Sequence, residues 1–347
     1  GDGVGGNFQE LLTAAARLDD HPLASHAALE IGNLLAREGK LNDAARQYER
    51  LADAAPDVHA RRAEFNLALI RVRQSNFARA RDLFLRVVDR RPDDETAQLA
   101  WWWIGRTHLD AGDQARAEKP LRRAAAGRST PVAAAAALAL ASLNLLTGDA
   151  DAAHAALSAA PRSGLRAPAL RDDATFLDAF ARYQLARRVR QLPLGETESL
   201  LWSLSDLSAE SLLGATITLL RGMALRELGM DARMAELFAL AIPKNHGPLA
   251  VRMTEMAADH FLRIADKTNA KPMLLALSTS DDDGARTRSR LRLARLALDA
   301  GRPAECLEWC RGLPIAPNAE SPRTLMGLAY QALGDPRRAA ESFAGQP

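Results

Sequence analysis

Residues 31–56 read IGNLLAREGKLNDAARQYERLADAAP and are the clearest guide to the architecture of this chain. Small and apolar side chains recur every three or four positions on both sides of Gly39, which is the spacing of one face of an α-helix. Glycine adopts a left-handed helix C-cap without steric cost, and Pro56 cannot continue a helix. The stretch therefore predicts two helices that fold back on each other at Gly39.

The same pattern returns along the chain. Short turn signals separate apolar stretches at positions 39, 75, 112, 148, 229, 301 and 334, so the gaps are 36, 37, 36, 81, 72 and 33 residues. The two long gaps each indicate a double step with a degenerate turn hidden inside. A period of this length is typical of solenoid proteins, in which each helix pair packs on the next.

The repeats resemble the tetratricopeptide repeat family. The unit Ile31-Gly32, Gly39, Ala44, Tyr48, Leu51 and Pro56 follows the family pattern, as do Met326-Gly327, Tyr330, Gly334, Ala339, Phe343 and Trp101, Ile104-Gly105, His108, Gly112, Ala117, Leu121. Looser matches are Leu67-Ala68, Ala80, Phe84, Val87, Pro92 and Gly222, Gly229, Phe238. The resemblance implies an all-α, right-handed α-solenoid of about nine antiparallel helix pairs.

Small and large residues alternate in the repeat register. We expect small residues such as Gly32, Gly105 and Ala44 to let the two helices of a pair approach closely. We expect large residues such as Tyr48 and Phe84 to fill the gap to the next pair.

Four segments are expected. Residues 1–6 read as a linker or cloning remnant, 7–161 as an N-terminal repeat array, 162–214 as a degenerate helical repeat and 215–347 as a C-terminal array. Within the degenerate part, helices are expected at 169–191 and 196–207. Both ends lack the polar capping helix that solenoids normally carry. This favours a piece of a larger bacterial protein, or end-to-end contact between copies.

Composition excludes several classes of partner. A net charge of +2, from 45 basic and 43 acidic residues, does not favour nucleic-acid binding. The uncharged stretch 129–148 is long enough to span a membrane, but it is mostly alanine, so we expect a core helix and no membrane insertion. A cytoplasmic location is favoured, and the periplasm remains open.

No catalytic constellation has convincing spacing. The seven histidines are scattered, and Cys306 and Cys310 occupy packing positions of the repeat. Phosphate-binding, metalloprotease and nucleophile-elbow motifs are not found. We therefore expect no enzyme activity, cofactor or metal.

Arginines cluster at 61–91, 182–190 and 286–295. Two interpretations stay open: solvated helix faces, or surfaces for an anionic partner.

The resemblance also implies a binding groove lined by the first helix of each pair. The projected groove residues are Leu29, Asn33, Arg62, Phe65, Asn66, Leu69, Arg73, Trp102 and Arg106. Asn33 and Asn66 match the asparagines of the family's carboxylate clamp, whereas its cationic positions read Leu29, Leu99 and Trp103 here. A dedicated clamp is therefore not expected, and the asparagines are expected to pair with a peptide backbone.

These features predict a non-catalytic scaffold that binds a protein or peptide, acidic with apolar anchors. Two alternatives remain. One is a self-assembling or dimerising repeat module, and the other is a regulatory segment of an enzyme or sensor whose catalytic domain lies outside this chain.

Overall fold

The computed structural model describes residues 14, 23–54, 58–166, 168–189, 195, 199, 201, 213–244, 247–314 and 321–344. These residues form 17 α-helices and two short 3-10 helices, with no strand among them. The chain divides into two compact units, residues 1–213 and 214–347, and each is described by itself. The expected all-α solenoid is confirmed. The expected linker at 1–6 and helix at 196–207 lie outside the described residues, apart from position 199 and position 201, which are helical.

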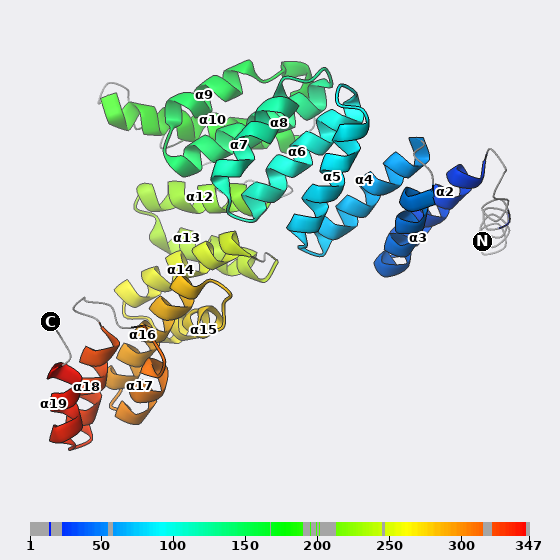
Figure 1. The fold of residues 1–347 in the computed structure, drawn as a ribbon. Coiled ribbons are helices and arrows are strands. Elements are labelled where there is room, and N and C mark those ends of the chain that lie inside the picture. Colours follow the sequence, from blue (N-terminus) through cyan, green and yellow to red (C-terminus); the bar gives the residue numbers. More distant parts are fainter. Residues whose placement is uncertain are drawn as a thin grey trace, which may run out of the picture. The chain divides into compact units, whose positions relative to one another are not determined.

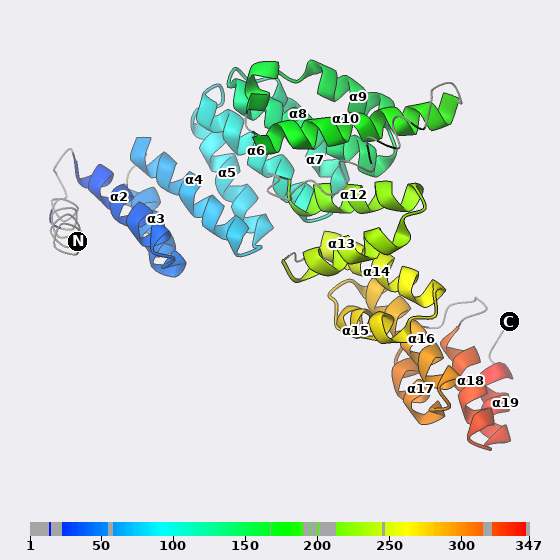
Figure 2. The same ribbon diagram turned by 180° about the vertical axis from the view of Figure 1, so that it is seen from behind.

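The first unit consists of antiparallel helix pairs. They are α2 (Ala24–Arg37) with α3 (Leu41–Ala54), α4 (Val58–Arg73) with α5 (Phe77–Arg90), α6 (Glu95–Asp110) with α7 (Gln114–Ala125), and α8 (Thr130–Thr147) with α9 (Ala150–Ala159). The short helix η1 (Arg162–Arg166) then leads to α10 (Pro168–Val189). Each helix packs on the next in chain order, as Figure 1 and Figure 2 show.

The second unit repeats this arrangement. Its helices are α12 (Ala215–Glu227), α13 (Asp231–Ala241), η2 (Ile242–Lys244), α14 (Pro248–Arg263), α15 (Lys267–Leu277), α16 (Asp283–Asp299), α17 (Pro303–Cys310), α18 (Pro322–Ala332) and α19 (Pro336–Ala344). Helices α12 and α14 contact each other, as do α16 and α18, so first helices of successive pairs lie side by side. In the first unit α2 contacts α4, α6 contacts α8, and α8 contacts α10 in the same way. The first helices therefore form one layer of each unit, which we call the inner layer.

The turns within the pairs share one backbone conformation. Their central residues have φ near +57° to +81°, at Gly39, Ser75, Gly112, Gly148, Gly229, Ala265, Gly301 and Gly334. Ala265, at φ 58°, is the turn hidden in the 72-residue gap, and it lacks the glycine that marks most of the others. In five pairs the residue after the turn caps the second helix, because its side chain accepts a hydrogen bond from the backbone three residues on. These caps are Asn76, Asp113, Asp149, Asp266 and Asp335.

The packing between paired helices differs in part from the sequence expectation. A Cβ atom added to Gly32 would collide with the ring of Tyr48, and one added to Gly222 would collide with Phe238. The aromatic residue of the second helix therefore packs directly against the backbone at the glycine of the first helix of the same pair, because glycine has no side chain to keep it away. Phe84 also extends to the next pair, where it stacks on Trp103.

Helix α8 is the uncharged segment noted above. It is long and apolar enough to cross a membrane by length and composition, with a mean hydropathy of 1.6. Two thirds of this segment is buried in the structure, where it packs against α7, α9, η1 and α10. We therefore interpret α8 as a core helix of the solenoid.

Candidate functional site

The projected groove positions lie on α2, α4 and α6, at matching distances from each turn. Leu29, Phe65 and Trp102 lie ten residues before their turns, and Asn33, Leu69 and Arg106 lie six before. Because these helices form the inner layer, the register places the residues on one face of the first unit. We call the exposed part of this face, formed by Phe65, Asn66, Leu69, Trp103 and Arg106, the inner surface.

Two of the projected residues are not accessible. Leu29 is 3% exposed and Trp102 is 5% exposed, so neither side chain is a contact point for a ligand. Leu29 belongs to the core that includes Tyr48, and Trp102 packs edge-on against Trp103 with centroids 4.8 Å apart. Both were projected into the groove, but the neighbouring side chains cover them.

The two projected asparagines are hydrogen-bonded to each other within the protein. The amide oxygen of Asn33 accepts hydrogen bonds from the Tyr48 hydroxyl at 2.8 Å and from Asn66 Nδ2 at 2.9 Å, while Asn33 Nδ2 donates to Glu30 at 3.1 Å. Burial raises the pKa of Tyr48 to about 12, so its hydroxyl stays a donor. Asn33 therefore orients Asn66, whose carbonyl oxygen has no hydrogen-bond partner among the described residues.

A chain of aromatic rings joins α4 to α6. Phe65 meets the fully buried Phe84 edge-on at 5.3 Å, and Phe84 stacks on Trp103 at 6.2 Å with an angle of 9° between the rings. Phe65 and Trp103 are half-buried, so part of each side chain reaches the surface. Trp103 stands at one of the clamp positions named in the sequence analysis, and it shares the register of Asn66, nine positions before the turn.

Arg106 lies over this aromatic cluster. Its guanidinium carbon is 4.8 Å from the centre of the Trp103 ring and 5.5 Å from that of Trp102. Its charged neighbour is Asp110, one turn along α6, whose Oδ2 is 3.6 Å from Arg106 Nε. Burial lowers the pKa of Arg106 and raises the pKa of Asp110, so desolvation outweighs their mutual attraction.

The edges of the inner surface are basic. Arg62 and Arg73 are exposed and have no ion-pair partner in the part of the chain that the structure describes. Leu69 is half-buried against the core between them along α4. The inner surface thus combines an apolar floor with unpaired positive charge.

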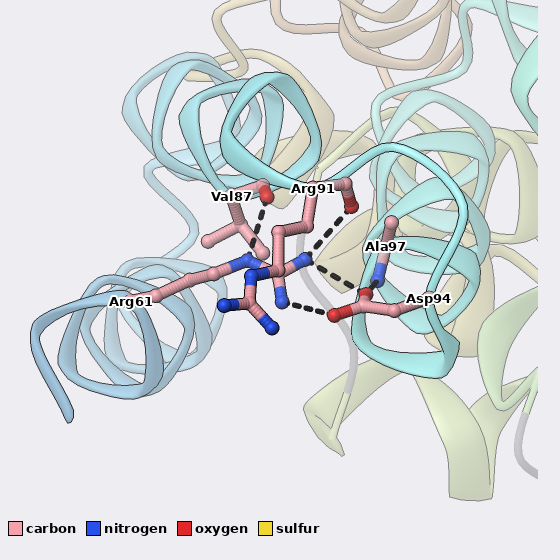
Figure 3. Close-up of polar contacts among 5 residues, drawn as sticks. All are labelled: Arg61, Val87, Arg91, Asp94 and Ala97. Carbon is pink, nitrogen blue, oxygen red and sulfur yellow. Dashed lines mark hydrogen bonds and ion pairs between the residues drawn. The ribbon is translucent and has the colours of Figure 1, made fainter. Parts of the chain in front are cut away.

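Other arginines of the first cluster are used inside the protein. Arg61 extends from α4 to the loop between α5 and α6 (Figure 3), where it donates to the carbonyl oxygens of Val87 at 2.9 Å and Arg91 at 3.0 Å and pairs with both oxygens of Asp94. This bond holds the pKa of Asp94 below its usual range. Asp94 in turn caps α6 through the backbone of Ala97 at 2.8 Å. Arg61 therefore fastens one repeat to the next.

A buried carboxylate forms ion pairs with two more arginines of this cluster. Glu64 on α4 is fully buried and accepts from Arg86 and Arg90 of α5. The equivalent of Arg61 in the following repeat is Gln98, which donates to the carbonyl oxygens of Ala124 and Ser129. These polar contacts stabilise the solenoid and leave those groups unavailable to a partner.

The second unit fills its inner positions differently. Arg288 of α16 pairs with Glu255 of α14 at 2.8 Å, and Arg292 pairs with Asp259 at 2.7 Å. Glu255 and Asp259 occupy the register of Phe65 and Leu69, while Arg288 and Arg292 occupy that of Leu99 and Trp103. The 286–295 arginines are therefore largely neutralised within the chain.

Residues with potential chemistry elsewhere are isolated. Cys306 and Cys310 are buried in the second unit's core, and the hydrogen bond that the Cys310 thiol donates to Cys306, together with burial, raises the pKa of Cys310. His108 is largely buried beside Asp113, and burial lowers its pKa. No group of three or more His, Cys, Asp or Glu residues in the described ranges is placed to hold a metal ion.

Solved structures of similar fold are helical-repeat proteins. A human IFIT1 dimer with m7Gppp-AAAA has a TM-score of 0.54 and 16% identity, over 92% of this chain and 71% of that one. A monomeric IFIT1 mutant with Gppp-AAAA has a TM-score of 0.55 and 17% identity, over 92% and 70%. A tetratricopeptide repeat protein from Parabacteroides merdae matches with a TM-score of 0.47 and 17% identity, over 74% and 93%. At this level of identity the likeness concerns the fold alone.

Sequence comparison identifies the repeats directly. No curated protein matches the chain. The profile of the tetratricopeptide repeat matches four overlapping ranges, residues 9–59, 29–95, 65–130 and 104–168. The matched ranges contain α2 to α9 and the inner surface. Residues 9–168 are therefore repeats of the tetratricopeptide repeat family, and these recognised repeats lie in the first unit.

Proposed function

We propose that this chain is a non-catalytic scaffold that binds a peptide or an extended protein segment on the inner surface of its first unit. The observation that carries the proposal is the contrast between inner positions. Among the described residues, Phe65, Leu69 and Trp103 leave the inner positions of α4 and α6 apolar and without ion pairs, whereas charged residues at the matching positions of α14 and α16 pair with each other. Tetratricopeptide repeats are in general protein-interaction scaffolds.

The chemistry of the inner surface suits a peptide. Aromatic and arginine side chains are the usual anchors of interfaces, because they combine a large apolar area with directional polar groups. The carbonyl oxygen of Asn66 can accept a backbone N–H of an extended peptide, and Asn33 and Tyr48 hold that amide in place. Self-association of repeat ends and a regulatory role beside a catalytic domain remain alternatives, which no contact in the described residues favours over peptide binding.

Selection from a random peptide library displayed on phage tests the proposal. The immobilised protein is expected to enrich a family of related peptides, and the double variant Asn66→Ala, Trp103→Ala is expected to reduce their recovery at least about tenfold. Trp309→Ala is the matched control, because Trp309 is also partly buried but lies in the second unit. That variant should retain full recovery.

The same proteins are then examined by circular dichroism and sedimentation velocity. Unchanged helicity shows that lost recovery is a surface effect. Equal recovery by the wild type and the double variant would refute the inner surface as the site. Binding of a fluorescent single-stranded RNA in place of any peptide would refute the class of partner.

A further inference from the structure

We propose that Arg106 is the charge-selecting anchor of the inner surface and that it takes a carboxylate side chain of an acidic peptide. This inference rests on the proposed function and adds the chemical class of the ligand. The argument uses the position of the guanidinium, its missing partners and the charges around it.

The position of Arg106 is fixed by the aromatic cluster. Stacking over Trp103 and Trp102, at 4.8 and 5.5 Å, holds the planar guanidinium against the indole faces. Trp103 is itself held by stacking on the buried Phe84. A side chain that is already ordered loses little conformational entropy when it binds, so this arginine is prepared for a ligand.

The hydrogen-bonding capacity of Arg106 is largely unused. Nε is buried and has no hydrogen-bond partner, and Asp110 approaches it only to 3.6 Å. The terminal Nη groups have no hydrogen-bond partner among the described residues. A guanidinium offers five N–H donors in a planar fork that matches a carboxylate. The two Nη groups offer the remaining donors, and a ligand carboxylate can accept parallel hydrogen bonds from them.

The surrounding charges select the kind of anion. The side chain of Arg106 is 22% exposed, so its charge is only partly screened by water. Arg62 and Arg73 add unpaired positive charge at the edges. Asp110 lies close enough to repel a doubly charged phosphate more strongly than a singly charged carboxylate. This combination favours Asp or Glu side chains over phosphate groups.

The test compares the peptides that each variant selects from the same phage library. Wild-type protein is expected to enrich Asp or Glu at one position beside an apolar anchor. The variant Arg106→Gln should lose this acidic preference, and Arg106→Glu should replace it with Lys or Arg. Arg122→Gln is the matched control, because Arg122 is an exposed arginine on α7 that pairs with Glu118.

A second variant acts in the opposite direction. Asp110→Asn removes the internal carboxylate that competes for Arg106, so a synthetic acidic peptide from the wild-type pool should bind about threefold or more tightly. Misfolding cannot produce a gain in affinity, which keeps the test valid if the Arg106 variants are unstable. Affinity is measured by fluorescence anisotropy with that peptide and with its Asp→Asn or Glu→Gln analogue.

The outcomes separate the two proposals. If wild-type protein selects no related peptides, the proposed function fails. If it selects peptides without an acidic position, or if Arg106→Glu keeps the acidic preference, peptide binding stands and the role of Arg106 is refuted. Weaker binding by Asp110→Asn would also refute it. Tighter binding of a phosphopeptide than of the acidic peptide would overturn the choice of carboxylate.

Discussion

The inner positions of α4 and α6 in the first unit and those of α14 and α16 in the second share one repeat register but contain different side chains. In the first unit they hold Phe65, Leu69 and Trp103, and the rings of Phe65 and Trp103 meet through the buried Phe84. In the second they hold Glu255 and Asp259 opposite two arginines. The comparison shows that the repeat determines where a surface forms, while the side chains determine whether that surface is already satisfied.

The two regions also use arginine differently. Arg288 and Arg292 are exposed or half-buried and pair across successive first helices, where water screens the ion pairs. Arg61 is buried and fastens the loop of the next repeat, whereas Arg106 lies half-buried over indole rings with one distant carboxylate. Burial and partnering, and not the number of arginines, therefore distinguish structural arginines from a candidate binding arginine.

The largest effect is expected from removing the ring between α4 and α6. Phe84→Ala should destabilise the first unit by about 3–5 kcal/mol, because it empties a fully buried site, and it should abolish peptide recovery by displacing Phe65 and Trp103. Hydrogen exchange in α4 and α6 measures the local loss of stability.

Leu274→Ala, at the equivalent position of α15, is the control. It should cost about 2–5 kcal/mol in the second unit and leave peptide recovery unchanged. Equal recovery by both variants would contradict the comparison.

A smaller effect is expected from the buried arginine. Arg61→Met should cost about 3 kcal/mol, because it leaves the carbonyl oxygens of Val87 and Arg91 unsatisfied and Asp94 unpaired. Urea unfolding followed by hydrogen exchange in α4 to α6 measures it. A loss no larger than that of Arg288→Met would show that burial does not separate the two kinds of arginine.

The same variant should change the response to acid. Because Arg61 lowers the pKa of Asp94, the folded state binds fewer protons than the unfolded state, and this stabilisation is complete only above the unfolded-state pKa of about 4. Wild-type protein should lose it as the pH falls from about 4 through the folded-state pKa of Asp94. In Arg61→Met this part of the pH dependence should be weaker, and an unchanged acid profile would contradict the assignment.

The smallest effect is expected from the ion pairs between α14 and α16. A double-mutant cycle on Arg288 and Glu255 should give a coupling of about 0.2–1 kcal/mol, because Arg288 is more than half exposed. Unfolding at low and high salt measures it, and the coupling should shrink as salt increases. A coupling above about 3 kcal/mol would place these pairs in the same class as the buried Arg61 contact.

Much of the fold could be predicted from the sequence, but the site only in part. The helix pairs follow from the spacing of Gly32, Gly39 and Tyr48, since a helix and its turn depend on residues a few positions apart. The turn at Ala265 was hidden because it has no glycine. The register projected Trp102 into the groove, but it could not show that Trp102 is buried, because this depends on Arg106 and Trp103, which pack against its ring.

The sequence alone therefore determined the repeat, the helix pairs and the helices that form the inner layer. The tertiary structure decided which charges are free. Arg61 meets Asp94 33 residues later, and Arg288 meets Glu255 33 residues earlier, while within the described ranges Arg106 has only Asp110 as an ionic neighbour, at 3.6 Å. The physical reason is the distance along the chain over which each interaction acts. Helix and turn propensities act between neighbours in the chain, whereas ion pairing and burial depend on distances between side chains that only the stacking of repeats brings together.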